Sequence, residues 1–163
     1  MMTPEGPRPA FPRANYYVQR DQWNAALQPT ERDRASYFPD DFMPLERAGV
    51  IQFLDGEGEL FPGISLRLFH GHTTALQCPV ISGEGKTLMF CADLVPMAPH
   101  VQLPWIMGYD LRPLVTLEEK RNILHIAAEE DWILMLEHDP LIEGVTVRHG
   151  PKGIERASEI MLG

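Results

Sequence analysis

The spacing of hydrophobic residues changes along the chain, and each change indicates the start of another predicted strand, helix or loop. Apolar residues alternate with polar ones over 64–69, which predicts a strand with one buried face. Two β-rich runs, 75–82 and 87–92, flank the segment 83–86, which predicts a hairpin with a four-residue loop. The run 132–137, which is apolar up to its last residue, Glu137, predicts a central, buried strand.

A helix with an apolar stripe is predicted over residues 113–131. Thr116 and Glu119 have the spacing of a capping box near its start. Residues 94–112, which precede the helix, are rich in proline and large apolar side chains and predict a long loop. A loop of that length in a compact domain is usually functional.

Weaker patterns predict the remaining elements. They are a flexible lead-in over 1–13, strands over 14–19, 50–54 and 145–149, helices over 21–27 (with Asp21 as N-cap), 30–37 and 39–49, and a terminal helix over 154–162. Taken together, the elements predict a single α/β domain over residues 14–163, with one mainly antiparallel or mixed sheet and helices on one face.

Composition narrows the classes of partner. The net charge of −9 on 163 residues argues against a nucleic-acid partner, because no basic patch would neutralise phosphates. No apolar stretch reaches membrane-spanning length, and the start does not resemble a secretory signal, so we expect no membrane contact and a cytoplasmic location. In a symmetric hairpin, Cys78 and Cys91 face each other. They could form a disulfide, but two buried free thiols are favoured in a reducing compartment.

Three residues with metal-binding side chains stand where β-rich runs stop. His72 follows the run 64–69, Asp93 follows 87–92, and His138 follows 132–137. Strand ends of this kind can converge on one rim of a sheet, where imidazole and carboxylate groups can bind a cation. The sequence therefore predicts a metal site formed by these three side chains.

The short motifs around these residues resemble a known family. Gly-His-Thr at His72, Phe-Cys-Ala-Asp ending in Asp93 and Glu-His-Asp around His138 appear in the order and spacing of metallo-β-lactamase-fold hydrolases. The segments 17–23 and 105–110 resemble the branch of lactonase-like and organophosphate-hydrolase-like enzymes. The resemblance covers about residues 12–140 and implies that this chain forms about half of an αββα sandwich, the C-terminal half.

Two features depart from the family pattern. The motif H-x-H-x-D-H, which lies in the first half of the family fold and supplies most metal ligands, is absent from the chain. The family commonly continues Gly-His-Thr with Pro-Gly-His, whereas here Thr74, Ala75 and Leu76 follow. By the family pattern that second histidine is not a ligand, so the change removes local support only.

The resemblance implies hydrolysis by two zinc ions. Asp93 would bridge both ions and is the residue assigned to catalysis, with His72 on one ion and His138 on the other. Two close metal ions lower the pKa of a shared water, which attacks a small ester, lactone or phosphotriester. Three ligands complete neither zinc site, because catalytic zinc normally has three protein ligands of its own. We therefore expect partial or no zinc occupancy and no turnover by this chain alone.

Other residues have weaker claims to function. Trp105, Met107, Tyr109 and His100 either line a substrate pocket beside the metals or belong to the loop and cap the core. His70 is expected to be a polar strand-end residue, and His125 and His149 surface residues, rather than ligands. Asp139 either orients a ligand or caps the turn before Pro140.

Alternatives to a hydrolase remain at this point. The chain can be a non-catalytic remnant, a split subunit that acts by pairing with another chain, or a truncated gene product. In a half-sandwich, the inner sheet face lacks its cover. We assign that face to Ile64, Leu66, Leu68, Val80 and Phe90. An apolar face of this size predicts a homo-oligomer, a complementing N-terminal half or poor solubility.

Overall fold

A computed structural model describes residues 2–3 and 6–161 of the chain. The chain divides into two compact units, Met1–Gly56 and Glu57–Gly163, and each is described by itself. The single domain over residues 14–163 stays a prediction. Of the lead-in 1–13, residues 1, 4 and 5 lie outside the described part. In the described part, no helix combines the length and the apolar character that a membrane crossing requires.

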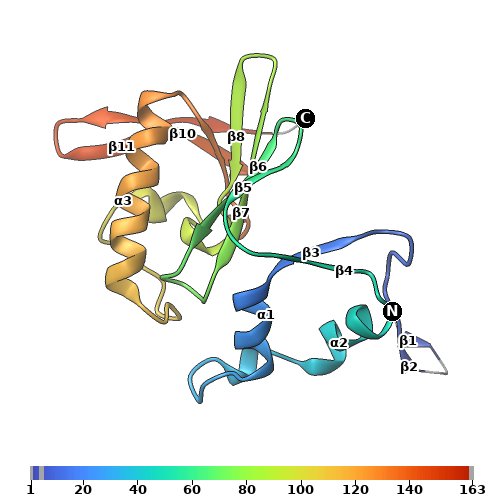
Figure 1. Cartoon of the computed structure of the whole chain (residues 1–163). Coiled ribbons are helices and arrows are strands. Elements are labelled where there is room, and N and C mark those ends of the chain that lie inside the picture. The colour runs from blue at the N-terminus through green and yellow to red at the C-terminus, as the bar shows by residue number, and fades with distance from the viewer. Residues whose placement is uncertain (1, 4–5, 162–163) are drawn as a thin grey trace. The chain divides into compact units, whose positions relative to one another are not determined.

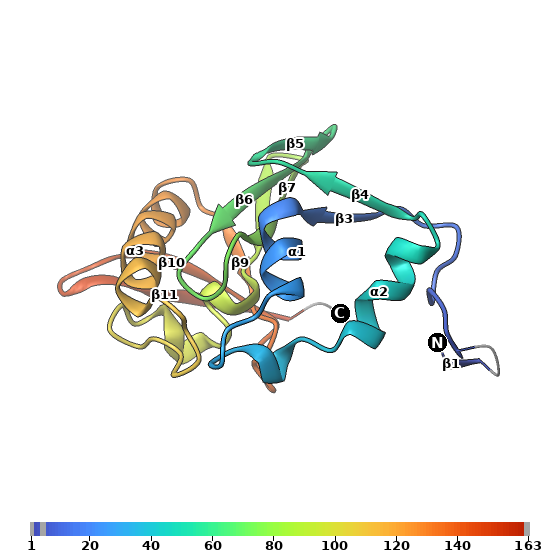
Figure 2. The ribbon, with the colours of Figure 1, turned by 60° about the horizontal axis from the view of Figure 1, so that its bottom comes forward.

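The first unit is a small α/β layer. Its elements are β1 (Met2–Thr3), β2 (Gly6–Pro7), β3 (Tyr16–Gln19), α1 (Arg20–Leu27), the 3-10 helix η1 (Arg34–Ser36), α2 (Pro39–Arg47) and β4 (Ile51–Leu54). Strands β3 and β4 pair in parallel, and both helices lie on one side of them (Figures 1 and 2). Trp23 of α1 is buried edge-on against Phe42 and Phe53, which explains why this unit is compact. The predicted N-cap Asp21 is wrong, because the N-cap of α1 is Gln19, two residues earlier.

The second unit contains the large sheet. Its elements are β5 (Gly58–Phe61), β6 (Ile64–Phe69), β7 (Leu76–Gly83), β8 (Lys86–Phe90), the 3-10 helices η2 (Ala92–Leu94) and η3 (Ala98–Val101), α3 (Pro113–Glu129), β9 (Ile133–Met135), β10 (Gly144–Gly150) and β11 (Gly153–Ile160). The seven strands follow the order β11-β10-β9-β8-β7-β6-β5. All neighbours are antiparallel except β8 and β9. The predicted fold class, a mostly antiparallel sheet forming half of a sandwich, is confirmed.

Helix α3 covers one face of this sheet (Figure 1). Ile123, Leu124 and Ala127 of the helix pack with buried residues of the strands, including Met89 and Leu134. Burial of such side chains is the main stabilising contribution to a core of this kind. The apolar run around β9 does form an interior strand, between β8 and β10, as its lack of polar residues predicted.

The opposite face of the sheet is also apolar. Ile81 pairs with Ile64 on one side and with Leu88 on the other, so these side chains share a face. Ile81 and Phe90 are 46% and 38% exposed. The assignment of Val80 to this face was wrong: Val80 is directly opposite Met89 and belongs to the core beneath α3. Successive residues of a strand point to opposite faces, and Val80 is therefore on the side opposite to Ile81.

Three further predictions differ from the structure. The 83–86 hairpin loop is shorter, because Gly83 and Lys86 pair and leave Glu84 and Gly85 as the turn. The terminal helix over 154–162 is wrong: residues 153–160 form strand β11 on β10, because pairing overrides the local helix preference of its Glu, Arg and Ala residues. Leu162 lies outside the described residues.

The capping box at Thr116 and Glu119 is the third. The N-cap of α3 is Arg112, with Pro113 in the first turn, so Thr116 already lies inside the helix. The carboxylate of Glu119 instead binds backbone groups of the loop that contains His72. Cys78 and Cys91 are both buried free thiols, as the favoured interpretation predicted.

Candidate metal centre

Strand direction brings three loop segments to one edge of the sheet. Strands β6 and β8 are both antiparallel to β7, and β9 is parallel to β8, so all three run the same way. Their C-terminal ends therefore meet at the same edge. His72 follows β6, Asp93 lies in η2 after β8, and His138 follows β9. This topology explains why residues so far apart in sequence become neighbours.

The three predicted residues are in contact. Nε2 of His72 lies 3.4 Å from Oδ2 of Asp93, and Nε2 of His138 lies 3.3 Å from Oδ1 of Asp93. The two histidines thus approach different oxygens of one carboxylate. A carboxylate between two imidazoles is a donor set that suits a divalent cation such as zinc.

His72 is held by a buried carboxylate. Its Nδ1 lies 2.7 Å from Oδ1 of Asp110, which is almost fully buried. Burial by itself lowers the pKa of His72, but the hydrogen bond to Asp110 and the charge of Asp93 outweigh it, so the pKa lies above the usual histidine value. When His72 donates Nδ1–H to Asp110, Nε2 is the ring nitrogen that faces Asp93 and that can bind a metal once it has lost its proton.

The loop around His72 is fixed by the start of α3. The carboxylate of Glu119 accepts hydrogen bonds from the backbone N–H groups of His70 and Gly71 at 2.6 and 3.0 Å. The backbone N–H of Arg112 donates to the carbonyl of Gly71 at 2.8 Å. A Cβ on Gly71 would overlap the backbone of Thr116, so only glycine permits this close approach to the helix.

The loops that contain Asp93 and His138 are tied together. The backbone N–H of His138 donates to the carbonyl of Pro96 at 3.0 Å. The carboxylate of Asp139 accepts from the N–H groups of Ala98, Leu141 and Ile142. These bonds make Asp139 a turn cap, the second of the two interpretations offered for it. Directly before Asp93, Ala92 has a φ of +45°, a strained conformation of the kind that is common at functional sites.

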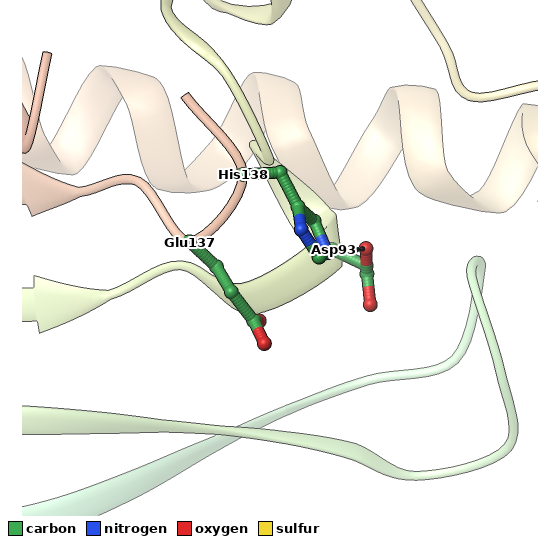
Figure 3. A group of neighbouring side chains, drawn as sticks. All are labelled: Asp93, Glu137 and His138. Atoms are coloured by element: carbon green, nitrogen blue, oxygen red, sulfur yellow. Dashed lines mark ion pairs between the residues drawn. The ribbon is translucent and has the colours of Figure 1, made fainter. Parts of the chain in front are cut away.

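Glu137 is a further candidate that the sequence analysis did not single out. One ligand atom from each of Asp93, Glu137 and His138 lies within 4.8 Å of the others (Figure 3). Glu137 directly precedes a predicted ligand and was placed at the end of the predicted strand 132–137. A residue next to a ligand normally points away from it, and the sequence pattern alone gave no reason to include Glu137.

The predicted pocket residues lie elsewhere on the long loop. Trp105 and Tyr109 are 57% and 73% exposed, so neither caps the core, and their role with Met107 in a substrate pocket stays a prediction. His100 lies in η3, where burial and the nearby charge of Lys120 lower its pKa. The fully buried Lys120 ties this loop to α3 by donating to the carbonyls of Gln102 and Trp105 at 3.0 and 2.7 Å.

The other histidines have local partners. Nδ1 of His70 accepts a hydrogen bond from the backbone N–H of Ala75 at 3.3 Å, which fits its expected role as a polar strand-end residue. The rings of His125 and His149 lie 5.2 Å apart, on α3 and β10, so the two pack against each other.

Comparison with known proteins identifies the family of the chain. Residues 8–140, most of the chain, match the family model of the metallo-beta-lactamase superfamily. The chain belongs to the metallo-β-lactamase superfamily. No curated protein sequence matches it significantly. The motifs at His72, Asp93 and His138 predicted this family and its fold. The family match confirms the family assignment.

Solved structures of this superfamily share the fold. A probable metal-dependent hydrolase from Staphylococcus aureus superposes with a TM-score of 0.81 at 20% identity, over 93% of this chain and 53% of that protein. AidC, a dizinc quorum-quenching lactonase, superposes with a TM-score of 0.77 at 18% identity, over 94% of this chain and 57% of that protein. AiiA from B. thuringiensis, with N-decanoyl-L-homoserine bound, superposes with a TM-score of 0.66 at 21% identity, over 80% of this chain and 49% of that protein. The chain therefore spans about half the length of these proteins.

Proposed function

We propose that the chain contributes one half of a two-metal hydrolase site for a small ester, lactone or phosphotriester. The observation that supports this most is the approach of His72 and His138 to the two different oxygens of Asp93. Those N–O separations are close to the edge of a ligand tetrahedron, about 3.3 Å for metal–ligand distances of about 2.0 Å. Each oxygen of Asp93 would thus share one metal position with one histidine.

The residues have separate tasks in this proposal. Asp93 bridges the two positions, Asp110 keeps Nε2 of His72 directed at the site, and Glu119 fixes the loop of His72 on α3. Bound zinc ions would supply Lewis acidity and lower the pKa of water. Because the chain lacks H-x-H-x-D-H, we propose that the remaining ligands come from a further polypeptide segment, which also covers the apolar sheet face around Ile81 and Phe90.

The test uses the protein in the cells that produce it. The tagged chain is isolated from its own host under native conditions, and the sample is assayed for zinc-dependent hydrolysis of an aryl ester, a homoserine lactone and a phosphotriester. A strain with His138→Ala provides the matched control. We expect activity in the complex that the variant loses, and none in the purified chain alone.

The same experiment can contradict the proposal. An inert complex, or activity that His138→Ala and Asp93→Ala leave unchanged, would favour the non-catalytic remnant. Light scattering tests the second part of the proposal: a monodisperse monomer of the isolated chain in zinc-free buffer would argue against a sheet face that needs a cover.

A further inference from the structure

The two proposed metal positions, one at each carboxylate oxygen of Asp93, differ in the number of possible ligands that this chain supplies. The position at Oδ2 has two donors from this chain, Asp93 and His72. The position at Oδ1 has Asp93 and His138, and Glu137 lies beside both, with one ligand atom of each residue within 4.8 Å of the others. Figure 3 shows the His138 ring beside Asp93, with the Glu137 side chain extending from the preceding residue.

Charge is a second observation that points to a cation here. Glu137 and Asp93 are two carboxylates at short range, and like charges this close disfavour each other. Among residues 2–3 and 6–161, no lysine or arginine forms an ion pair with either of them. A divalent ion between the two carboxylates would neutralise both.

The backbone on both sides of Glu137 is fixed, while its side chain is exposed. The N–H of Leu136 donates to the carbonyl of Glu143 at 2.9 Å, and the N–H of His138 donates to the carbonyl of Pro96 at 3.0 Å. The backbone at Glu137 is thus held in place, and the distance of its carboxylate from the position at Oδ1 is set by its side-chain torsions.

We propose that Glu137 is a metal ligand, and that Asp93, Glu137 and His138 together hold one zinc ion on this chain alone. Three protein ligands with a fourth position open to water is the arrangement of a catalytic zinc site. The proposal rests on the proposed function and changes one expectation from the sequence: the position at Oδ1 needs no ligand from another segment, whereas the position at Oδ2 does.

The experiment measures binding of Zn²⁺ to the full, metal-free chain by isothermal titration calorimetry. Wild type should bind one equivalent. Loss of residues that merely support a ligand lowers metal affinity about 10- to 100-fold, so Glu137→Gln, which removes a ligand, should weaken binding at least about tenfold. Glu129→Gln is the matched control, since Glu129 is an exposed carboxylate on α3, and it should bind like wild type.

A spectroscopic measurement keeps the result independent of affinity alone. Co²⁺ in place of Zn²⁺ gives visible absorption that depends on coordination number and ligands. The spectrum should change in Glu137→Gln and stay unchanged in Glu129→Gln, with circular dichroism confirming that all variants are folded.

Two outcomes would overturn the proposal in distinguishable ways. If Glu137→Gln binds Zn²⁺ within about twofold of wild type while His138→Ala loses binding, Glu137 is not a ligand, yet the proposed function stands. If wild type binds no Zn²⁺, the complete site on this chain is refuted, and the activity of the native complex then decides the proposed function separately.

Discussion

The two histidines beside Asp93 are held very differently. The side chain of His72 is 14% exposed, with its Nδ1 on a buried carboxylate. The side chain of His138 is 51% exposed, and within the described residues no buried carboxylate supports it in the same way. The first ring is oriented in advance by the fold, and the second lies at an open rim beside another exposed acid. The position with the better-held histidine thus has two donors from this chain, and the position with the exposed histidine has a third candidate donor, Glu137.

Removal of the shared carboxylate should have the largest effect. Asp93 belongs to both positions, so Asp93→Ala should abolish measurable Zn²⁺ binding by the isolated chain. Asp131→Asn is a suitable control, because Asp131 is exposed and its positive φ of 53° is one that asparagine tolerates. Calorimetric binding of Zn²⁺ by Asp93→Ala at wild-type strength would show that the metal is bound elsewhere.

Asp110→Asn should affect the His72 side of the metal centre and leave the His138 side unchanged. The substitution removes a buried, charge-assisted hydrogen bond to His72. The free energy of unfolding, measured with urea, should therefore fall by about 1–2 kcal/mol. The ¹⁵N spectrum should show His72 losing its single tautomer. Zn²⁺ affinity of the isolated chain should stay close to wild type, and a loss as large as that of Glu137→Gln would contradict the proposed division of the site.

Lys120 offers a pH test of the loop that contains Asp110. Burial lowers the pKa of Lys120 to about 8, although the charge of Asp110 acts in the opposite direction. The unfolded chain therefore binds more protons than the folded chain between pH 8 and the usual lysine pKa of about 10.4. Stability should rise with pH across that window, by up to about 1.4 kcal/mol per pH unit.

The control for this test is Lys120→Met, which keeps the side-chain length. Its free energy of unfolding should lack the rise that wild type shows above pH 8, when urea midpoints are compared at equal ionic strength. Identical pH profiles of the two proteins would mean that Lys120 stays charged in the folded chain.

Asp139→Ala should have the smallest effect on stability, and the effect should be confined to the His138 side of the metal centre. The hydrogen bonds that Asp139 accepts from Ala98, Leu141 and Ile142 cap a turn, and loss of a cap costs about 1 kcal/mol. Burial raises the pKa of Asp139, but the three N–H groups lower it by more, so the net pKa is below the usual value. The stabilisation is thus present above about pH 4 and disappears as the pH falls, which acid unfolding of the variant would reveal.

Strand-level patterns predicted more of this molecule than capping patterns did. The alternation over β6, the apolar run at β9 and the spacing of His72, Asp93 and His138 were enough to place three loops at one edge of a sheet. Each of these features depends on residues that are buried or adjacent along a strand. Such local patterns are visible in a single sequence.

The missed features depend on tertiary neighbours. Glu119 has the spacing of a capping residue but binds the His72 loop, and residues 153–160 prefer a helix locally but pair with β10. Asp110 and Glu137 belong to the site only because of how the long loop and the end of β9 fold back. No period in the sequence encodes a contact of this kind, so the site extends beyond what the motifs indicated.

The metal centre at this edge of the sheet is tested most directly by ¹⁵N NMR of the imidazole nitrogens of all six histidines while Zn²⁺ is added to the metal-free chain. We expect Nε2 of His138 to shift first and His125 and His149 not to respond. A response at His125 or His149 with His138 unchanged would contradict a metal centre at this edge of the sheet.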